Sequence, residues 1–223
     1  VVLLGKGDHQ ITSSWTDESG NGYATTFYVT RSNITFVGTE KSTTKILGGF
    51  VIENVENITF KQMTVTNTSD PGYSYRDGGN GIRMSNANIE LFDVAIDGCG
   101  SAGLRIKDPT SDTSVVATRC EFANSNYGAI VGGSLQRSTC LITAKFNNCL
   151  FHDNKCHGIH GYNGSTINLH GEATAIHSNG SGGISAWNYC KVLIHLPSHH
   201  NTIYNEEEDR HTRNGGTITN VED

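Results

Sequence analysis

Short alternations of apolar and polar residues recur down the whole chain. The most regular one starts with glycine and reads GIRM at Gly81, GLRI at Gly103, GAIV at Gly128, GIHG at Gly158 and GISA at Gly183. Apolar residues at every second position are typical of β-strands that bury one face. The steps between these glycines are 22, 25, 30 and 25 residues, so the pattern indicates a structural repeat.

Two further strands accompany each glycine phrase. One has its inward residue in phrases such as NITF and NIEL, at Ile34, Ile58, Ile89, Val115, Ile142, Ile167 and Val192. The other precedes each glycine and is expected to bury Val65, Ile96, Phe122, Phe151, Ile176 and Ile203. Such strands are too short to bury a face alone, but stacked repeats pair their backbones about 4.8 Å apart and enclose a continuous core.

The sequence therefore predicts an all-β fold, a right-handed single-stranded parallel β-helix (β-solenoid) of about seven to eight coils. Each coil is expected to contain three short strands. No shift in composition marks a second domain, so residues 1–223 are expected to form a single β-helix domain. The opening residues, VVLL, read like the middle of a strand, and we expect the chain to be a fragment or processed form of a longer one.

The glycine and N-I-x-F phrases resemble the parallel β-helix repeats of the pectin-lyase-like superfamily. This resemblance covers roughly residues 30 to 220 and singles out no specific member. It implies a fold more than an activity, because the superfamily includes lyases, hydrolases, epimerases, phage tailspikes and noncatalytic scaffolds.

Asparagines and cysteines are expected to stack in the same way. Asn124, Asn154 and Asn179 each lie four residues before a glycine, which predicts an asparagine ladder that bonds successive turns. Cys120 and Cys149 each precede an inward phenylalanine by two residues. We expect them on adjacent coils of the interior, where either a disulfide or two stacked thiols fits.

Net charge and hydropathy restrict the partners. The formal charge is −6 and the pI is near 5.9, which argues against a nucleic-acid partner because phosphate neutralisation needs clustered Lys and Arg. No run approaches the roughly 18 apolar residues of a membrane span, so no membrane insertion is expected.

Outward residues of successive coils should form straight columns, and one such surface collects the candidate chemistry. Its two columns are Arg83, Arg105, Ile130, His160 and Ser185, and Asn80, Ala102, Tyr127, His157 and Gly182. The longest interruption between the glycine phrases, residues 68–79, places Tyr75 and Asp77 beside them. Aromatic platforms, guanidinium groups and titratable side chains suit an extended carbohydrate.

These residues also suit polyuronate chemistry. Elimination or C5 epimerisation requires a neutralised carboxylate, a base for a carbon-bound proton and a proton donor. We assign Arg105 to the carboxylate, His157 or His160 as the base and Tyr127 as the acid, with Tyr75, Asp77 and Arg83 as substrate-binding residues. The alternative is that these are ordinary exposed side chains on a strand-rich surface.

Two known signatures are broken here. The phrases RIK at Arg105 and HG at His157 resemble those of polygalacturonases, but their order is reversed and no Asp-Asp pair exists. The Asp-Pro-His signature of alginate epimerases is also absent, because Asp70-Pro is followed by Gly72 and Asp108-Pro by Thr110. If the protein is an enzyme, a lyase or epimerase is favoured over a paired-carboxylate glycoside hydrolase.

No cofactor or metal is expected. His152 and His177 are expected to share one outward column, and His170, His195 and Lys145 another. Two imidazoles are fewer than the three or more ligands of a stable site. The leading hypothesis is polysaccharide recognition on one face of the solenoid, with polyuronate lyase or epimerase activity as its extension. The alternative is a noncatalytic structural or protein-interaction scaffold, a virion, cell-surface or multi-protein assembly component, with a protein assembly partner in place of the polysaccharide.

Overall fold

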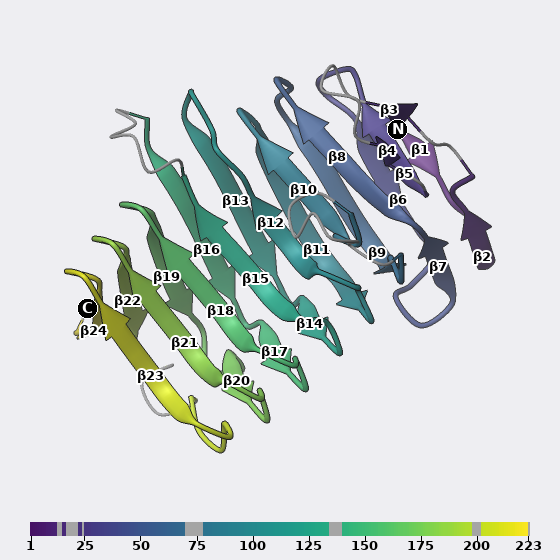
Figure 1. Ribbon diagram of the computed structural model, residues 1–223. Coiled ribbons are helices and arrows are strands. Elements are labelled where there is room, and N and C mark those ends of the chain that lie inside the picture. The colour runs from purple at the N-terminus through teal and green to yellow at the C-terminus, as the bar shows by residue number, and fades with distance from the viewer. Residues whose placement is uncertain are drawn as a thin grey trace.

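The computed structural model describes residues 1–12, 15–16, 22–23, 25–69, 78–133, 140–197 and 202–222. Parallel strands stack coil upon coil along one axis, and the first and last coils lie at opposite ends (Figure 1). The described residues contain strands and turns and no helix. The predicted parallel β-helix is therefore confirmed.

Two long sheets form the walls. The first sheet contains β1 (Val2–Leu3), β6 (Thr35–Val37), β9 (Ile58–Thr66), β11 (Asn88–Asp97), β13 (Thr113–Thr118), β16 (Ile142–Asn147), β19 (Thr166–His170), β22 (Lys191–His195) and β24 (Thr217–Val221). The second sheet contains β5 (Thr26–Val29), β8 (Gly49–Glu53), β10 (Ile82–Ser85), β12 (Ala102–Ile106), β15 (Tyr127–Gly132), β18 (His157–Tyr162), β21 (Gly182–Trp187) and β23 (Glu208–Arg213).

Shorter strands close the third side. They are β2 (Gly7–Gln10), β7 (Thr44–Leu47), β14 (Glu121–Ala123), β17 (Leu150–His152) and β20 (Ala175–His177), which pair around the ends of β9 and β11. A small antiparallel pair, β3 (Trp15–Thr16) and β4 (Gly22–Tyr23), forms a separate two-stranded sheet.

Single left-handed residues turn the chain at the corner between the first sheet and the short strands. Gln62, Asp93, Arg119 and Asn148 occupy this corner with φ between 52° and 56°. A second row of left-handed residues follows the second sheet and includes Asn54, Asn86, Asn163, Asn188 and Asn214. Asparagine tolerates this conformation better than most residues, which explains its frequency in the sequence.

The register agrees with most of the predicted columns. Ile82, Leu104, Ala129, Ile159 and Ile184 pair directly, as the glycine phrases indicated. Two assignments were wrong. Val115 pairs with Ala144 and not with Ile142, and Ile176 bridges to Thr202. Ile203 is accordingly 41% exposed, whereas Thr202 is buried.

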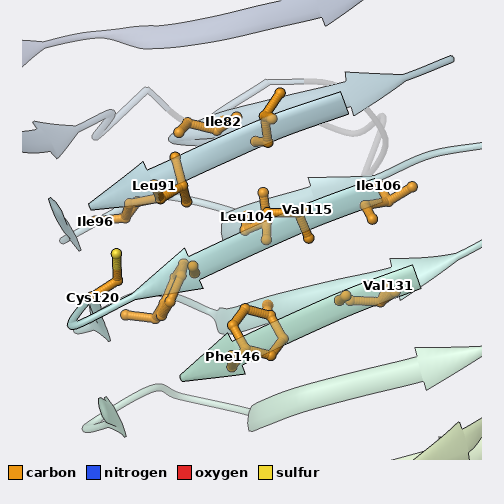
Figure 2. Close-up of a cluster of buried hydrophobic side chains, with 14 of the residues drawn as sticks. Ile82, Leu91, Ile96, Leu104, Ile106, Val115, Cys120, Val131 and Phe146 are labelled. Atoms are coloured by element: carbon orange, nitrogen blue, oxygen red, sulfur yellow. The ribbon is translucent and has the colours of Figure 1, made fainter. Parts of the chain in front are cut away.

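Apolar side chains from all three sides fill the interior. In Figure 2, Ile82, Leu104 and Ile106 of the second sheet face Leu91, Val115 and Phe146 of the first. Within a column identical residues stack, and the rings of Phe122 and Phe151 lie parallel with centroids 4.7 Å apart. Burial of each such ring stabilises the fold by about 2–3 kcal/mol.

Glycine occupies the position before the first inward apolar residue in several strands of the second sheet, because a Cβ there would clash with the backbone of the next coil. A Cβ on Gly128 would lie 2.5 Å from the carbonyl oxygen of Gly158. A Cβ on Gly183 would lie 2.6 Å from the carbonyl oxygen of Asp209. The coils can therefore approach this closely only where the side chain is a hydrogen atom.

An asparagine ladder is present, but one predicted member was wrong. Asn154 Nδ2 donates to Asn179 Oδ1 at 2.9 Å, and Asn179 Nδ2 donates to Asn205 Oδ1 at 2.8 Å. In the preceding coil Ser125 holds this position, since its N–H donates to Asn154 Oδ1 at 3.1 Å. Asn124 is instead an exposed left-handed residue that donates to Asp97 Oδ1.

The six cysteines are free thiols in this structure. Cys120 and Cys149 lie on adjacent coils of the interior as predicted, and the N–H of Leu150 donates to the carbonyl oxygen of Cys120. Burial raises the pKa of Cys120 well above its ordinary value. These two residues therefore pack as stacked thiols, the second of the two expected arrangements.

Substitution Asn179→Ala should lower the free energy of unfolding by about 2–3 kcal/mol, because it leaves buried ladder groups of both neighbouring coils without partners. Urea denaturation measures this change. The control Asn220→Ala removes an exposed amide whose Oδ1 accepts a hydrogen bond from Arg210 Nη1, and it should change the free energy by less than about 0.5 kcal/mol. Equal effects of the two substitutions would contradict a stabilising ladder.

Candidate functional site

The outward residues of the second sheet form straight columns across the coils. The middle column runs Tyr28, Val51, Arg83, Arg105, Ile130, His160, Ser185 and His211. Its central five members were predicted from the glycine spacing. Along the strands, Tyr127 and His157 flank this column on one side, and Tyr162 and Trp187 on the other. We call the surface formed by Arg105, Tyr127, His157, His160, Tyr162, Ser185 and Trp187 the aromatic face.

Four proposed catalytic side chains converge on this face. The ring centroids of Tyr127 lie 6.1 Å from His157 and 6.0 Å from His160, and the two imidazoles are 5.8 Å apart. Arg105 lies in the adjacent coil in register with Ile130, and its positive charge opposes the rise in the pKa of Tyr127. Side chains from three successive coils thus lie close together although they are more than 20 residues apart in the sequence from one coil to the next.

Burial changes the protonation of this cluster. It lowers the pKa of His160 to about 4, with smaller contributions from the charges of His157 and Arg105. The pKa of His157 is also lowered, mainly by burial and then by His211. Burial, assisted by the neighbouring Cys156, raises the pKa of Tyr127 to about 12. At neutral pH both imidazoles are therefore uncharged and the phenol keeps its proton.

Arg83 lies in the coil before Arg105 and is bound to an acidic side chain. Its Nη1 forms an ion pair with Glu53 Oε1, and the Tyr28 hydroxyl donates to Glu53 Oε2 at 3.3 Å. Only 12% of the Arg83 side chain is exposed. A ligand carboxylate at Arg83 would thus have to compete with Glu53. The two other predicted substrate-binding residues, Tyr75 and Asp77, lie outside the described residues.

The sequence reasoning missed Tyr162, Trp187, His211 and Arg213. Tyr162 and Trp187 lie two residues after His160 and Ser185, so continued period-two counting would have found them. His211 and Arg213 lie on β23, whose sequence EDRHTR has no glycine phrase to align it. The Arg213 guanidinium lies 5.2 Å from the Trp187 ring centroid, a cation–π arrangement.

The histidine pairs on the other sides form stacks. The ring centroids of His152 and His177 lie 5.3 Å apart, and the His152 imidazole also contacts the carboxylates of Glu121 and Asp153. The ring centroids of His170 and His195 lie 3.9 Å apart. The prediction that Lys145 shares their column was wrong, because Lys145 pairs with Asn168. Within the described ranges, no three or more His, Cys, Asp and Glu side chains are arranged to hold a metal ion.

Comparison with known proteins agrees with this architecture. The family model of the right-handed β-helix region matches residues 21–207, most of the chain. The chain belongs to the right-handed β-helix family. No curated protein matches the sequence of this β-helix. Because folds of this kind host unrelated activities, function has to be argued from the aromatic face itself.

None of the segments that the structure describes forms a helix with the length and apolar character needed to cross a bilayer.

The free energy of unfolding should fall as the pH is lowered from about 6.5 to 4, because unfolding restores an ordinary pKa to His160. A histidine whose pKa is lowered by folding stabilises the fold fully above its unfolded pKa, and this contribution is lost as the pH falls through the folded pKa. For His160 the loss amounts to about 3 kcal/mol. Urea denaturation at pH 7 and pH 4 measures it.

His160→Gln should reduce this loss, because glutamine does not titrate. The matched control is His9→Gln in the first coil, outside the aromatic face. It should leave the pH dependence close to that of the unsubstituted protein, and an equal reduction in both variants would argue against a buried neutral His160.

Proposed function

We propose that the aromatic face recognises an extended polysaccharide. The observation that carries this proposal is the convergence of Arg105, Tyr127, His157 and His160 from successive coils. Aromatic rings provide apolar platforms for sugar rings, and a guanidinium can bond a carboxylate through two N–H groups. The columns continue through Tyr162 and Trp187, so the face has the length to contact several sugar units.

The same cluster supports modification of a uronic acid. Arg105 neutralises the sugar carboxylate, which makes the neighbouring C5–H bond more acidic. His157 accepts this proton, the electron pair of the C5–H bond forms a C4–C5 double bond, and the C4–O bond breaks with its electron pair on the leaving oxygen. Tyr127 donates its proton to the leaving oxygen, which completes an elimination. In C5 epimerisation, Tyr127 would instead return a proton to C5 from the opposite side.

Burial distinguishes the two imidazoles. A general base works best when its pKa lies near the working pH. His160, with a pKa of about 4, is neutral but weakly basic. The pKa of His157 is lowered less than that of His160, and His157 lies in the same flanking column as Tyr127. These differences favour His157 as the base and leave His160 for another task.

The carboxylates near this face support a lyase or epimerase over a hydrolase. Glycoside hydrolysis uses two carboxyl groups that flank the scissile bond. Glu53 forms an ion pair with Arg83, and Glu208 Oε2 contacts His211 Nδ1 at 2.8 Å. Glu207 and Asp108 act through their charges on His157 and Tyr162 from outside the face. The seven residues of the aromatic face itself include no carboxylate.

A panel of neutral oligosaccharides and polyuronates tests the proposal. Isothermal titration calorimetry measures binding, and ultraviolet absorbance of the unsaturated product measures elimination. Proton exchange at C5 in deuterated water measures epimerisation. Binding without turnover would restrict the function to recognition. No binding to any member would overturn the proposal and favour the alternative, a noncatalytic scaffold or protein-interaction module.

Arg105→Met should weaken polyuronate binding roughly 10–100-fold, because charge-assisted hydrogen bonds to the carboxylate are lost. Calorimetry of the folded variant measures the change. The control Lys145→Met removes an exposed positive charge from the first sheet and should leave the affinity unchanged. Equal losses in both variants would indicate a general effect of charge.

His157→Gln should lower kcat about 10²–10⁴-fold and change KM little, because glutamine keeps the polar contact but cannot accept a proton. Initial rates over a range of polyuronate concentrations separate these two parameters. A variant that retains kcat would exclude His157 as the base.

A further inference from the structure

Ser185 is a fully buried residue on an outward column. It lies in register between His160 and His211, and its exposed fraction is 0%. Its Oγ has no hydrogen-bond partner among the residues that the structure describes. An unpaired buried hydroxyl costs about 1–3 kcal/mol, so such a group needs a physical explanation.

Two more polar atoms beside Ser185 share this property. Trp187 Nε1 and His160 Nδ1 are both buried and have no hydrogen-bond partner within the described part of the chain. Trp187 follows Ser185 by two residues and so projects from the same face of β21. Its ring lies edge-on to His160, with centroids 5.2 Å apart. The three atoms therefore belong to one small region of the aromatic face.

The donor chemistry of this region favours an anion. The indole N–H can only donate, the serine hydroxyl can donate, and a protonated imidazole donates from both nitrogens. Positive charge flanks the region, since Arg213 lies over the Trp187 ring and Arg105 acts on His160 from β12. Oxyanions accept several hydrogen bonds at once and gain most from charged donors.

We propose that Ser185, Trp187 and His160 form a second subsite of the aromatic face, which binds a sugar oxyanion, either a carboxylate or a sulfate ester, and that His160 takes up a proton as the anion binds. This inference rests on the proposed function, because the polysaccharide carries the anion. It adds a recognition site distinct from the cluster of Arg105, Tyr127 and His157, which is assigned to the reacting sugar.

Proton uptake follows from the surroundings of His160. The titratable and charged groups around it are Arg105 from β12, Tyr127 from β15, His157 and Tyr162 from β18, and His211 and Arg213 from β23. Glu207 acts through its charge on the neighbouring His157. Burial and the positive neighbours keep free His160 neutral at pH 6. An anion at the subsite offsets these effects and favours the imidazolium. Anion affinity should therefore rise as the pH falls from 7.5 to 5.

Calorimetry of the full chain with three probes of equal length tests this inference. The probes are a neutral galacto-oligosaccharide, an oligogalacturonate and a sulfated galacto-oligosaccharide. We expect at least one anionic probe to bind tenfold or more tightly than the neutral one, and the tighter of the two identifies the anion. Equal binding of all three would overturn the subsite but leave the proposed function standing. No binding at all would overturn both.

Proton uptake is measured by titrating the tighter anionic probe at pH 6 in two buffers of different ionisation enthalpy. We expect about one proton taken up per bound chain, and close to none with His160→Gln. An unsubstituted protein that binds the anion without proton uptake would overturn the role of His160. This measurement needs no variant to fold.

Trp187→Phe retains an aromatic ring but removes the N–H, and Ser185→Ala removes the hydroxyl. Each should weaken binding of the anionic probe about tenfold more than binding of the neutral probe. The control Ser114→Ala removes a hydroxyl from the outer face of the first sheet and should affect neither probe. Equal weakening of neutral and anionic probes by Trp187→Phe would overturn the role of the indole N–H group in anion binding.

Discussion

Parallel hydrogen bonding between successive coils is the interaction on which every other feature of this β-helix depends. Because each strand pairs with its equivalent in the next coil, residues about 25 positions apart in the sequence lie side by side. Inward positions then form apolar columns such as Phe122 on Phe151, and outward positions form polar ones. Core and candidate site are two sides of the same strands.

Close stacking limits what the corners can contain. Glycine is required where the backbones approach most closely, and left-handed residues such as Asp93 and Arg119 bend the chain within one position. Buried polar groups at the turns are bonded from coil to coil, with Asn154 and Asn179 as the clearest example. The turns therefore contribute to stability as well as to direction.

The aromatic face differs, because some of its buried polar groups are not hydrogen-bonded within the part of the chain that the structure describes. Ser185 Oγ and Trp187 Nε1 are buried without partners in the described residues, whereas the ladder amides at the same level of the solenoid are bonded. His160 is kept neutral by burial, with smaller contributions from the charges of His157 and Arg105. Groups held at such cost in one region of the surface support a binding role for that region.

The sequence by itself determined the fold and the outward column from Arg83 to Ser185, because the glycine spacing records the period of the coil. It could not place Asn124, Ile142 or Ile203 correctly, since turn lengths differ by one or two residues between coils and nothing local marks the difference. Only the tertiary structure paired Arg83 with Glu53 and brought Trp187 and His211 beside His160. Burial and charge, which decide protonation, arise from residues that meet only when the coils stack.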